Sequence, residues 1–195
     1  MKSQIKHRYI SAVLYECELP DTTPSGMVIR LTLEKAVKDR ASLVGARLVG
    51  ARLDGASLDG ARLDGARLDG ASLDGARLDG ASLDGASLVG ARLDGARLDG
   101  ASLVGASLVG ALIFGKKLIG PRPIFQIGPI GSRSDYFISY TTDAGIMLKA
   151  GCFTGTIGEF EAKLTEEHGD NNHAQEYRAA LELIKTHATI WKDEK

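Results

Sequence analysis

Apolar and polar positions recur with a period of five through the middle of the chain. From residue 41 to residue 110 the sequence repeats the word A-x-L-x-G fourteen times without a gap, with Ser or Arg second and Asp or Val fourth. Two degenerate words, ALIFG and KKLIG, extend the array to residue 120. A period of five matches neither a helix nor an ordinary strand. A glycine in every word would also cost a helix roughly 1 kcal/mol each time, so a long helix is excluded.

Each word predicts one short extended segment followed by a corner. The glycine is third in the four-residue turn L-D-G-A, the position that requires a positive φ in a type II turn. Leu and Ala are two residues apart and point to the same side of an extended segment, so the second and fourth letters face solvent. This close-packed interior has no ligand cavity, so the array predicts no catalytic residue and no cofactor. The predicted core consists of Leu43, Leu48, Leu53, Leu58, Leu63, Leu68, Leu73, Leu78, Leu83, Leu88, Leu93, Leu98, Leu103 and Leu108.

The array resembles the pentapeptide repeat proteins, whose consensus is roughly A-(D/N)-L-x-x with a central Leu or Phe. The resemblance covers residues 41–120 and implies a mainly β fold, a right-handed quadrilateral β-helix with four words per coil. The sixteen words would then make about four coils. The chain departs from the consensus at the second letter, where Ser or Arg replaces Asp or Asn. Words this uniform indicate either recent duplication of a five-codon unit or deliberate consensus design.

The outer letters of the array are close to electroneutral. Four words per coil would stack the aspartates of successive coils on shared faces. Asp54, Asp74 and Asp94 would share one face with Arg52 and Arg92, and Asp59, Asp79 and Asp99 would share the next with Arg77 and Arg97. Residues 41–110 contain seven Arg and nine Asp, and the net charge of the whole chain is −1. Some members of the family mimic B-form DNA and bind DNA gyrase, a role that needs a strongly negative rod. A DNA mimic that binds gyrase or topoisomerase is therefore the alternative hypothesis. The Ser/Arg choices follow no clear four-word pattern and predict no residue-specific binding face.

Apolar letters mark both ends of the array. Val44 and Val49 lie at its start, and Val89, Val104 and Val109 lie near its end. They predict either an adhesive patch for a partner or side chains that the terminal domains cover, because a β-helix must cap its open ends. Capping is the preferred interpretation. The residues predicted to cap or to interact are Leu112, Phe114, Ile119 and Trp191.

Residues 1–40 predict an N-terminal cap made of a hairpin and a helix. The segment HRYISAVLYECELP (7–20) alternates as a strand, DTTPSG has turn chemistry, and MVIRL (27–31) predicts the second strand. The following TLEKAVKDR predicts a short helix that leads into the first coil.

Residues 121–195 predict a small α+β domain of three strands and two helices. The strands are expected at 124–130, 136–141 and 146–150. Thr156 and Glu159 have capping-box spacing for a helix to about residue 168. Asp170 or Asn171 caps a longer helix to about Lys192. The apolar stripe of that helix is Tyr177, Leu181, Ile184, Ala188 and Trp191. The segment resembles a C-terminal domain of some bacterial and phage-borne pentapeptide repeat proteins, which implies a fold and no activity.

Three groups in this domain raise the question of chemistry. The loop GPIGSRS (128–134), with Arg133, could cradle a phosphate, but it lacks a GK[ST] ending and joins two strands, so a tight connection is the preferred interpretation. His168, Asp170 and His173 could hold a metal, although a helix–helix turn uses the same residues as caps. Cys152 could act as a nucleophile if His168 or His173 lay beside it as a base. The preferred reading is a buried, inert thiol, with no metal site and no catalytic residue.

The remaining features bound the class of protein. The N-terminal segment is basic, but its apolar stretch is too short for the hydrophobic region of a signal peptide, and no apolar run reaches the length of a membrane span. Cys17 and Cys152 form no CxxC motif and predict reduced thiols in a cytoplasmic protein, with a disulfide as the alternative. The sequence thus predicts a non-enzymatic scaffold that binds a protein partner. It predicts no small-molecule substrate, no direct contact with nucleic acid and no membrane, and an exposed edge would allow a homo-oligomer.

Overall fold

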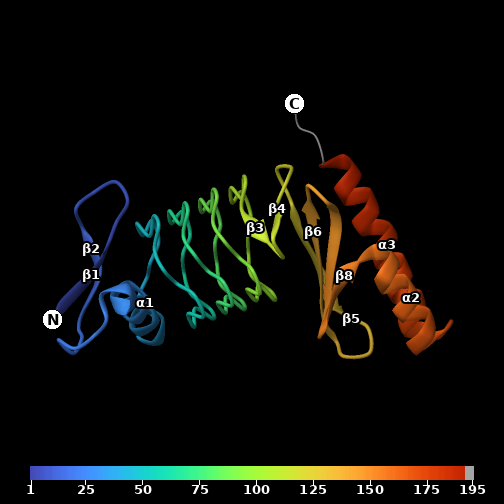
Figure 1. Cartoon of the computed structure of the whole chain (residues 1–195), viewed down its shortest axis with the longest axis horizontal. Helices are drawn as coiled ribbons and strands as arrows, with labels where there is room; N and C mark the ends of the chain where they lie inside the picture. The colour runs from blue at the N-terminus through green and yellow to red at the C-terminus, as the bar shows by residue number, and fades with distance from the viewer. Residues whose placement is uncertain (192–195) are drawn as a thin grey trace. The chain divides into compact units, whose positions relative to one another are not determined.

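The computed structural model describes residues 1–191 and divides into two compact units, one from Met1 to Gly115 and one that begins at Lys116 (Figure 1). The first unit contains, in order, β1 (Lys2–Lys6), β2 (Val13–Glu18), the 3-10 turn η1 (Ser25–Met27), α1 (Val28–Lys38), the repeat array and β3 (Leu112–Ile113). The second contains β4 (Lys116–Lys117), β5 (Ile124–Ile130), β6 (Asp135–Thr142), β7 (Gly145–Ala150), β8 (Phe153–Thr156), α2 (Ile157–His168) and α3 (Asn172–Ile190).

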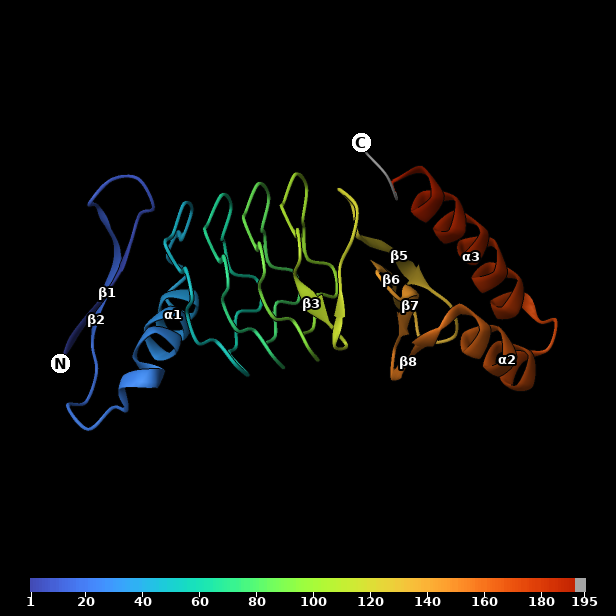
Figure 2. The ribbon, with the colours of Figure 1, turned by 45° about the horizontal axis from the view of Figure 1, so that its top comes forward.

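The array winds into a helix of short parallel bridges in which each turn takes four words. Arg47 bridges Arg67, and Arg52 bridges Ser72, each pair twenty residues apart. The Leu48 N–H donates to the Arg67 carbonyl at 2.7 Å, and the Arg67 N–H donates to the Ala46 carbonyl at 2.8 Å. Figure 2 shows the successive turns of this β-helix side by side. Backbone N–H and C=O groups of one turn therefore bond to those of the next, which satisfies buried groups that would otherwise lack a partner.

Every corner of the array uses a glycine in the left-handed region. The φ angles of the fifth letters from Gly45 to Gly115 lie between 62° and 70°. The residue before each of these glycines keeps a negative φ except Phe114 (52°). The Ala46 N–H closes the first corner on the Leu43 carbonyl at 3.0 Å. A positive φ at the third position alone is the pattern of a type II turn, as the sequence predicted.

The interior of the array contains the leucine and alanine letters. Leu73 and Ala71 are both 0% exposed. Among the fourteen predicted core leucines, all but Leu103 are at most 5% exposed, and Leu103 is partly exposed.

The N-terminal hairpin confirms one predicted strand and replaces the other, since β2 lies within the predicted segment 7–20 but its partner is β1. β1 pairs antiparallel with β2, so that Ser3 faces Cys17 and Ile5 faces Tyr15. The segment 27–31, predicted as the second strand, instead ends η1 and starts α1. The segment forms a helix and not a strand because its apolar positions recur at helical spacing and pack inward. Leu33 and Ala36 are both 0% exposed.

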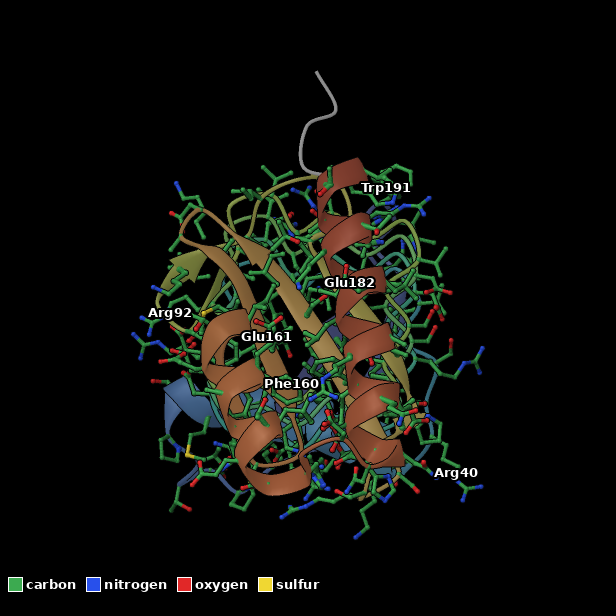
Figure 3. All side chains as sticks on the ribbon, turned by 90° about the vertical axis from the view of Figure 1, so that its right-hand side faces the viewer. Arg40, Arg92, Phe160, Glu161, Glu182 and Trp191 are labelled. Carbon is green, nitrogen blue, oxygen red and sulfur yellow. The ribbon has the colours of Figure 1, made fainter. Side chains whose placement is uncertain are left out.

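In the second unit, two helices cover one face of an antiparallel sheet. The strand order is β5-β6-β7-β8, and α2 and α3 lie on the same side of it, with Phe160 between them (Figure 3). The core contains Phe137, Leu148, Phe160, Leu164, Ala174, Ala180, Leu181 and Ile184. The prediction of three strands in this domain was wrong, because β8 adds a fourth along β7.

The helix starts in this unit follow the predicted caps. Thr156 and Glu159 form a reciprocal capping box at the start of α2. The Asn171 side chain accepts a hydrogen bond from the Ala174 N–H at the start of α3. The predicted end of this helix near Lys192 lies outside the described residues. Within residues 1–191, no helix combines the length and the apolarity needed to cross a membrane.

Candidate functional site

The outer letters of the array form a ladder between successive turns. Arg92 Nη2 donates to Asp74 Oδ2 at 2.5 Å, and Arg77 Nη2 lies 2.5 Å from Asp59 Oδ2. Ser72 makes the same contact with Asp54 through its hydroxyl. In each pair the donor is the second letter of a word and lies eighteen residues after the fourth letter that accepts. Ser and Arg can therefore interchange where an aspartate lies eighteen residues earlier, because both donate to that carboxylate.

The same carboxylates also bind the backbone. Asp74 Oδ1 accepts a hydrogen bond from the Asp94 N–H at 3.1 Å, and Asp84 Oδ1 accepts one from the Val104 N–H at 3.0 Å. Burial raises the pKa of Asp69, but hydrogen bonds from Ser87, Arg67 and the Val89 backbone outweigh it and leave this pKa below its ordinary value. The aspartates are thus part of what joins one turn to the next. Ion pairs within the ladder neutralise much of the aspartate charge. Asp74, for example, pairs with Arg92, whose side chain points outward in Figure 3.

The valine letters break this ladder and stay on the surface. Val44 and Val49 are 40% and 48% exposed, so the N-terminal hairpin and α1 do not cover them. Val89, Val104 and Val109 are also exposed. The preferred interpretation was therefore wrong for Val44 and Val49, because α1 contacts backbone groups of the first turn instead of these valine side chains.

The other residues predicted to cap or to interact are only half-buried. These are Leu112, Phe114, Ile119 and Trp191. The guanidinium of Arg122 lies over the Trp191 ring, 4.1 Å from its centroid. His187 stacks on Phe125 with ring centroids 4.2 Å apart, and one of its ring nitrogens lies 3.1 Å from the Arg122 carbonyl oxygen. Trp191 therefore holds the end of α3 against the segment before β5.

The N-terminal elements reach the first turns of the array through polar contacts. Arg30 donates to the Asp54 carbonyl at 2.6 Å and to the Gly55 carbonyl at 2.9 Å. Glu34 accepts a hydrogen bond from the Ser57 N–H at 3.0 Å. These contacts satisfy backbone groups of the first turn, which has no earlier turn to bond with.

The loop proposed for phosphate already holds a carboxylate. The Gly131 N–H donates to Glu176 Oε2 at 2.7 Å, so the amide that a phosphate would need is engaged. The Tyr177 ring also packs onto Gly131, where a Cβ would lie 2.1 Å from the Tyr177 hydroxyl oxygen. The loop acts as a tight connection that docks on α3.

Three of the sequence candidates do meet, around a shallow hollow of about 100 Å³. Arg133, Cys152 and His168 line it above a floor that includes Phe160 and Tyr177. Cys152 is exposed, which corrects the expectation of a buried thiol. Among the described residues, no hydrogen bond joins Cys152 to His168. The arrangement therefore lacks the thiol–base contact that nucleophilic catalysis uses.

The residues considered for a metal are used by the helix–helix turn. Asp170 forms a 2.8 Å ion pair with Arg178, and an imidazole nitrogen of His168 lies 3.5 Å from the Asn171 amide. Across residues 1–191, no group of three His, Cys, Asp or Glu side chains is placed to hold a metal ion. Cys17 and Cys152 are both free.

Sequence reasoning missed a larger groove, of about 330 Å³, beside the β6–β7 turn and α3. Its polar groups bond to each other and to the surrounding chain. Thr142 donates to the Gly145 carbonyl at 2.6 Å, Asp143 accepts from the Lys117 N–H at 3.1 Å, and Lys185 pairs with Glu161 and Glu182. No sequence motif marks it, because its lining comes from separate elements.

The repeat words, their left-handed glycines and the twenty-residue bridge spacing agree with one family. A model of pentapeptide repeats, in eight copies, matches residues 39–75 and 76–112. The chain belongs to the pentapeptide repeat family. Membership implies a quadrilateral β-helix for the array and makes this pentapeptide repeat protein a repeat scaffold.

Solved pentapeptide repeat proteins resemble the chain in part. One from the thylakoid lumen of Arabidopsis thaliana is 28% identical over 36% of this chain and 59% of its own, with a TM-score of 0.29. HetL, involved in heterocyst differentiation regulation in the cyanobacterium Nostoc sp. strain PCC 7120, is 39% identical over 36% of this chain and 40% of its own, with a TM-score of 0.25. Another from Nostoc PCC 7120 is 35% identical over 43% of this chain and 78% of its own, with a TM-score of 0.22. No curated protein matches the chain.

Proposed function

We propose that this pentapeptide repeat protein is a non-enzymatic scaffold that binds another protein in the cytoplasm through the surface letters of its array. The observation that carries the proposal is the filled interior: Leu73 and Ala71 are 0% exposed, so the array has only its outer surface to offer a ligand. A surface that mixes exposed valines with arginines suits a protein partner.

The proposal includes the finer architecture. The array is a right-handed helix of about four coils, with the three parts 1–40, 41–120 and 121–195 acting as cap, shaft and terminal domain. The bonds from Arg30 to the Asp54 and Gly55 carbonyls support the capping role of α1. A cap of this kind protects the open edge of a β-helix from pairing with other chains.

An affinity capture with the full chain tests the scaffold. Three baits are compared: the unchanged chain, Cys152→Ser, and Leu73→Asp, which disrupts the array. We expect one protein to be retained from the cytoplasmic fraction by the first two baits and lost from the third. A partner that disappears with Cys152→Ser, or turnover of a substrate that depends on Cys152, would contradict a non-enzymatic scaffold, as would failure to retain any protein.

The alternative is a DNA mimic that binds gyrase or topoisomerase. The pairing of Asp59 with Arg77 and of Asp74 with Arg92 weighs against it, because these carboxylates are neutralised within the ladder and such a mimic needs a negative rod. A gyrase supercoiling assay separates the two functions. Inhibition at micromolar protein would support the mimic, and its absence would remove that role.

A further inference from the structure

The ladder between fourth and second letters lacks its carboxylate where the fourth letter is a valine. Wherever an arginine follows an aspartate by eighteen residues, the two form an ion pair, as Arg77, Arg92 and Arg97 do. Arg62 and Arg67 instead follow Val44 and Val49 by eighteen residues. The corresponding position after Val89 is the neutral Ser107. Within the words of the array, these two arginines alone have a valine, and not an aspartate, eighteen residues earlier.

The two arginines differ in what they do instead. Arg67 turns to the aspartate of its own word, Asp69, at 2.8 Å. Arg62 forms no ion pair with any residue of the described chain. The carboxylates nearby are already engaged, since Asp64 accepts from the Ser82 hydroxyl and Asp69 accepts from Ser87 as well as from Arg67.

Two further arginines belong to the same corner. Arg47 bridges Arg67 on the next turn. The Arg8 N–H donates to the Gly45 carbonyl at 2.8 Å, and its guanidinium reaches the corner one turn later, where a Cβ on Gly65 would lie 3.8 Å from Arg8 Nη2. Neither Arg8 nor Arg47 has an acidic partner in the part of the chain that the structure describes. We call Arg8, Arg47, Arg62 and Arg67 the arginine corner.

Exposed apolar side chains accompany the arginine corner. Tyr9 and Ile10 are 75% and 60% exposed, and the Arg8 guanidinium lies 4.4 Å from the centre of the Tyr9 ring. Val44 and Val49 occupy the places of the missing carboxylates. Arginine and aromatic side chains are enriched in the centres of protein interfaces. Exposed arginine, tyrosine and apolar side chains together are therefore typical of a binding surface.

We propose that the arginine corner binds an acidic peptide segment of a partner protein, whose carboxylates replace the missing ladder aspartates and whose apolar side chains cover Val44 and Val49. The inference rests on the proposed scaffold function and assigns it a location and a partner chemistry. Charge complementarity selects an acidic occupant. The interleaved apolar side chains favour a peptide over a nucleic acid, whose phosphates would leave the valines uncovered.

Fluorescence anisotropy with the full chain tests the assignment. The probe is a fluorescein-labelled peptide of alternating glutamate and leucine, with a lysine–leucine peptide and a single-stranded oligonucleotide as comparisons. The variant Arg62→Ser with Arg67→Ser removes two arginines of the corner. The matched control, Arg77→Ser with Arg97→Ser, removes the same charge from laddered arginines. Both variants use a letter that the array itself carries at these positions, so both retain the fold.

We expect the Kd of the acidic probe to rise about threefold to tenfold in the corner variant and less than about twofold in the control. Added salt should weaken binding to the unchanged chain. Equal losses in the two variants, tighter binding of the oligonucleotide, or no binding of the acidic probe would overturn the proposal. If the corner variant still retains the partner found by affinity capture, the scaffold stands and the arginine corner is not its binding site.

Discussion

Arg92 Nη2 lies 2.5 Å from Oδ2 of Asp74, eighteen residues earlier in the chain and one turn away. The other oxygen of the same carboxylate accepts the Asp94 N–H at 3.1 Å. One aspartate therefore joins two turns through a side chain and through the backbone. The two bonds should contribute differently to stability. The Arg92 side chain is 57% exposed, whereas the Asp94 N–H has no other acceptor in the described chain.

Asp74→Ala should accordingly cost more stability than Arg92→Ser. We expect a loss of about 1–2 kcal/mol for Asp74→Ala, which removes the acceptor of a backbone amide. Arg92→Ser should cost less than about 0.5 kcal/mol, because exposed ion pairs contribute little and serine can take the same place. Urea denaturation followed by circular dichroism gives both values. An Arg92→Ser loss as large as that of Asp74→Ala would show that the ion pair, not the amide bond, joins the turns.

The leucine column should tolerate truncation only where it is uncovered. Leu73→Ala leaves a cavity in a filled interior and should cost about 2–5 kcal/mol, whereas Leu103→Ala removes a partly exposed side chain and should cost less than half as much. Leu73→Asp should unfold the central turns, because it buries an unpaired charge. Arg77→Ser on the outer surface should stay within about 0.5 kcal/mol of the unchanged chain. Thermal denaturation ranks the four variants, and equal losses for the two alanine variants would contradict the assigned interior.

Two glycines with open surroundings should respond in opposite directions to alanine. No atom would lie within 4 Å of a Cβ on Gly75 or on Gly158. Gly75 has a φ of 67°, so Gly75→Ala should destabilise by about 1–2 kcal/mol through backbone strain. Gly158 lies in α2, where alanine should stabilise by up to about 1 kcal/mol. Chemical denaturation of the two variants measures the signs, and a harmless Gly75→Ala would argue against the type II corners.

The hairpin should lose stability in strong alkali through one tyrosine. The Tyr15 hydroxyl donates to Asp39 Oδ2 at 2.5 Å. That hydrogen bond, with smaller effects of burial and charge, raises the pKa of Tyr15 from 10.0 to about 12. A raised pKa means that the folded state holds the proton more tightly. The contribution is therefore complete below pH 10 and is lost as the pH rises through 12.

Comparison of Tyr15→Phe with the unchanged chain tests this expectation. Unfolding free energies measured between pH 8 and about pH 12 should fall more steeply for the unchanged chain than for Tyr15→Phe. Tyr9→Phe is the control, because Tyr9 is 75% exposed. This substitution should leave the slope of unfolding free energy against pH unchanged. If Tyr15→Phe and the unchanged chain lose stability in parallel, the Tyr15–Asp39 bond does not form in solution.

Local signals predicted the elements that depend on neighbouring residues in the chain. Thr156 and Glu159 indicated the start of α2 by their spacing, and Asn171 was one of two residues expected to cap α3. The prediction of a strand at 27–31 was wrong because a short apolar run fits a strand or a helix equally well. Packing of Leu33 and Ala36 decided for the helix. Phe153–Thr156 was missed because four residues with an internal glycine carry little strand signal until β7 lies beside them.

The sequence by itself determined the array, because a five-residue word with glycine at its corner fixes the turn and sorts Leu inside from Ser, Arg and Asp outside. It also located Cys152, His168 and Arg133 as residues to examine. Only the tertiary structure decided which outer letters bond to one another, since partners eighteen residues apart become neighbours when the chain has wound once around. That winding pairs Arg92 with Asp74 and brings Arg62 to a valine, a difference that is invisible along a chain of near-identical words.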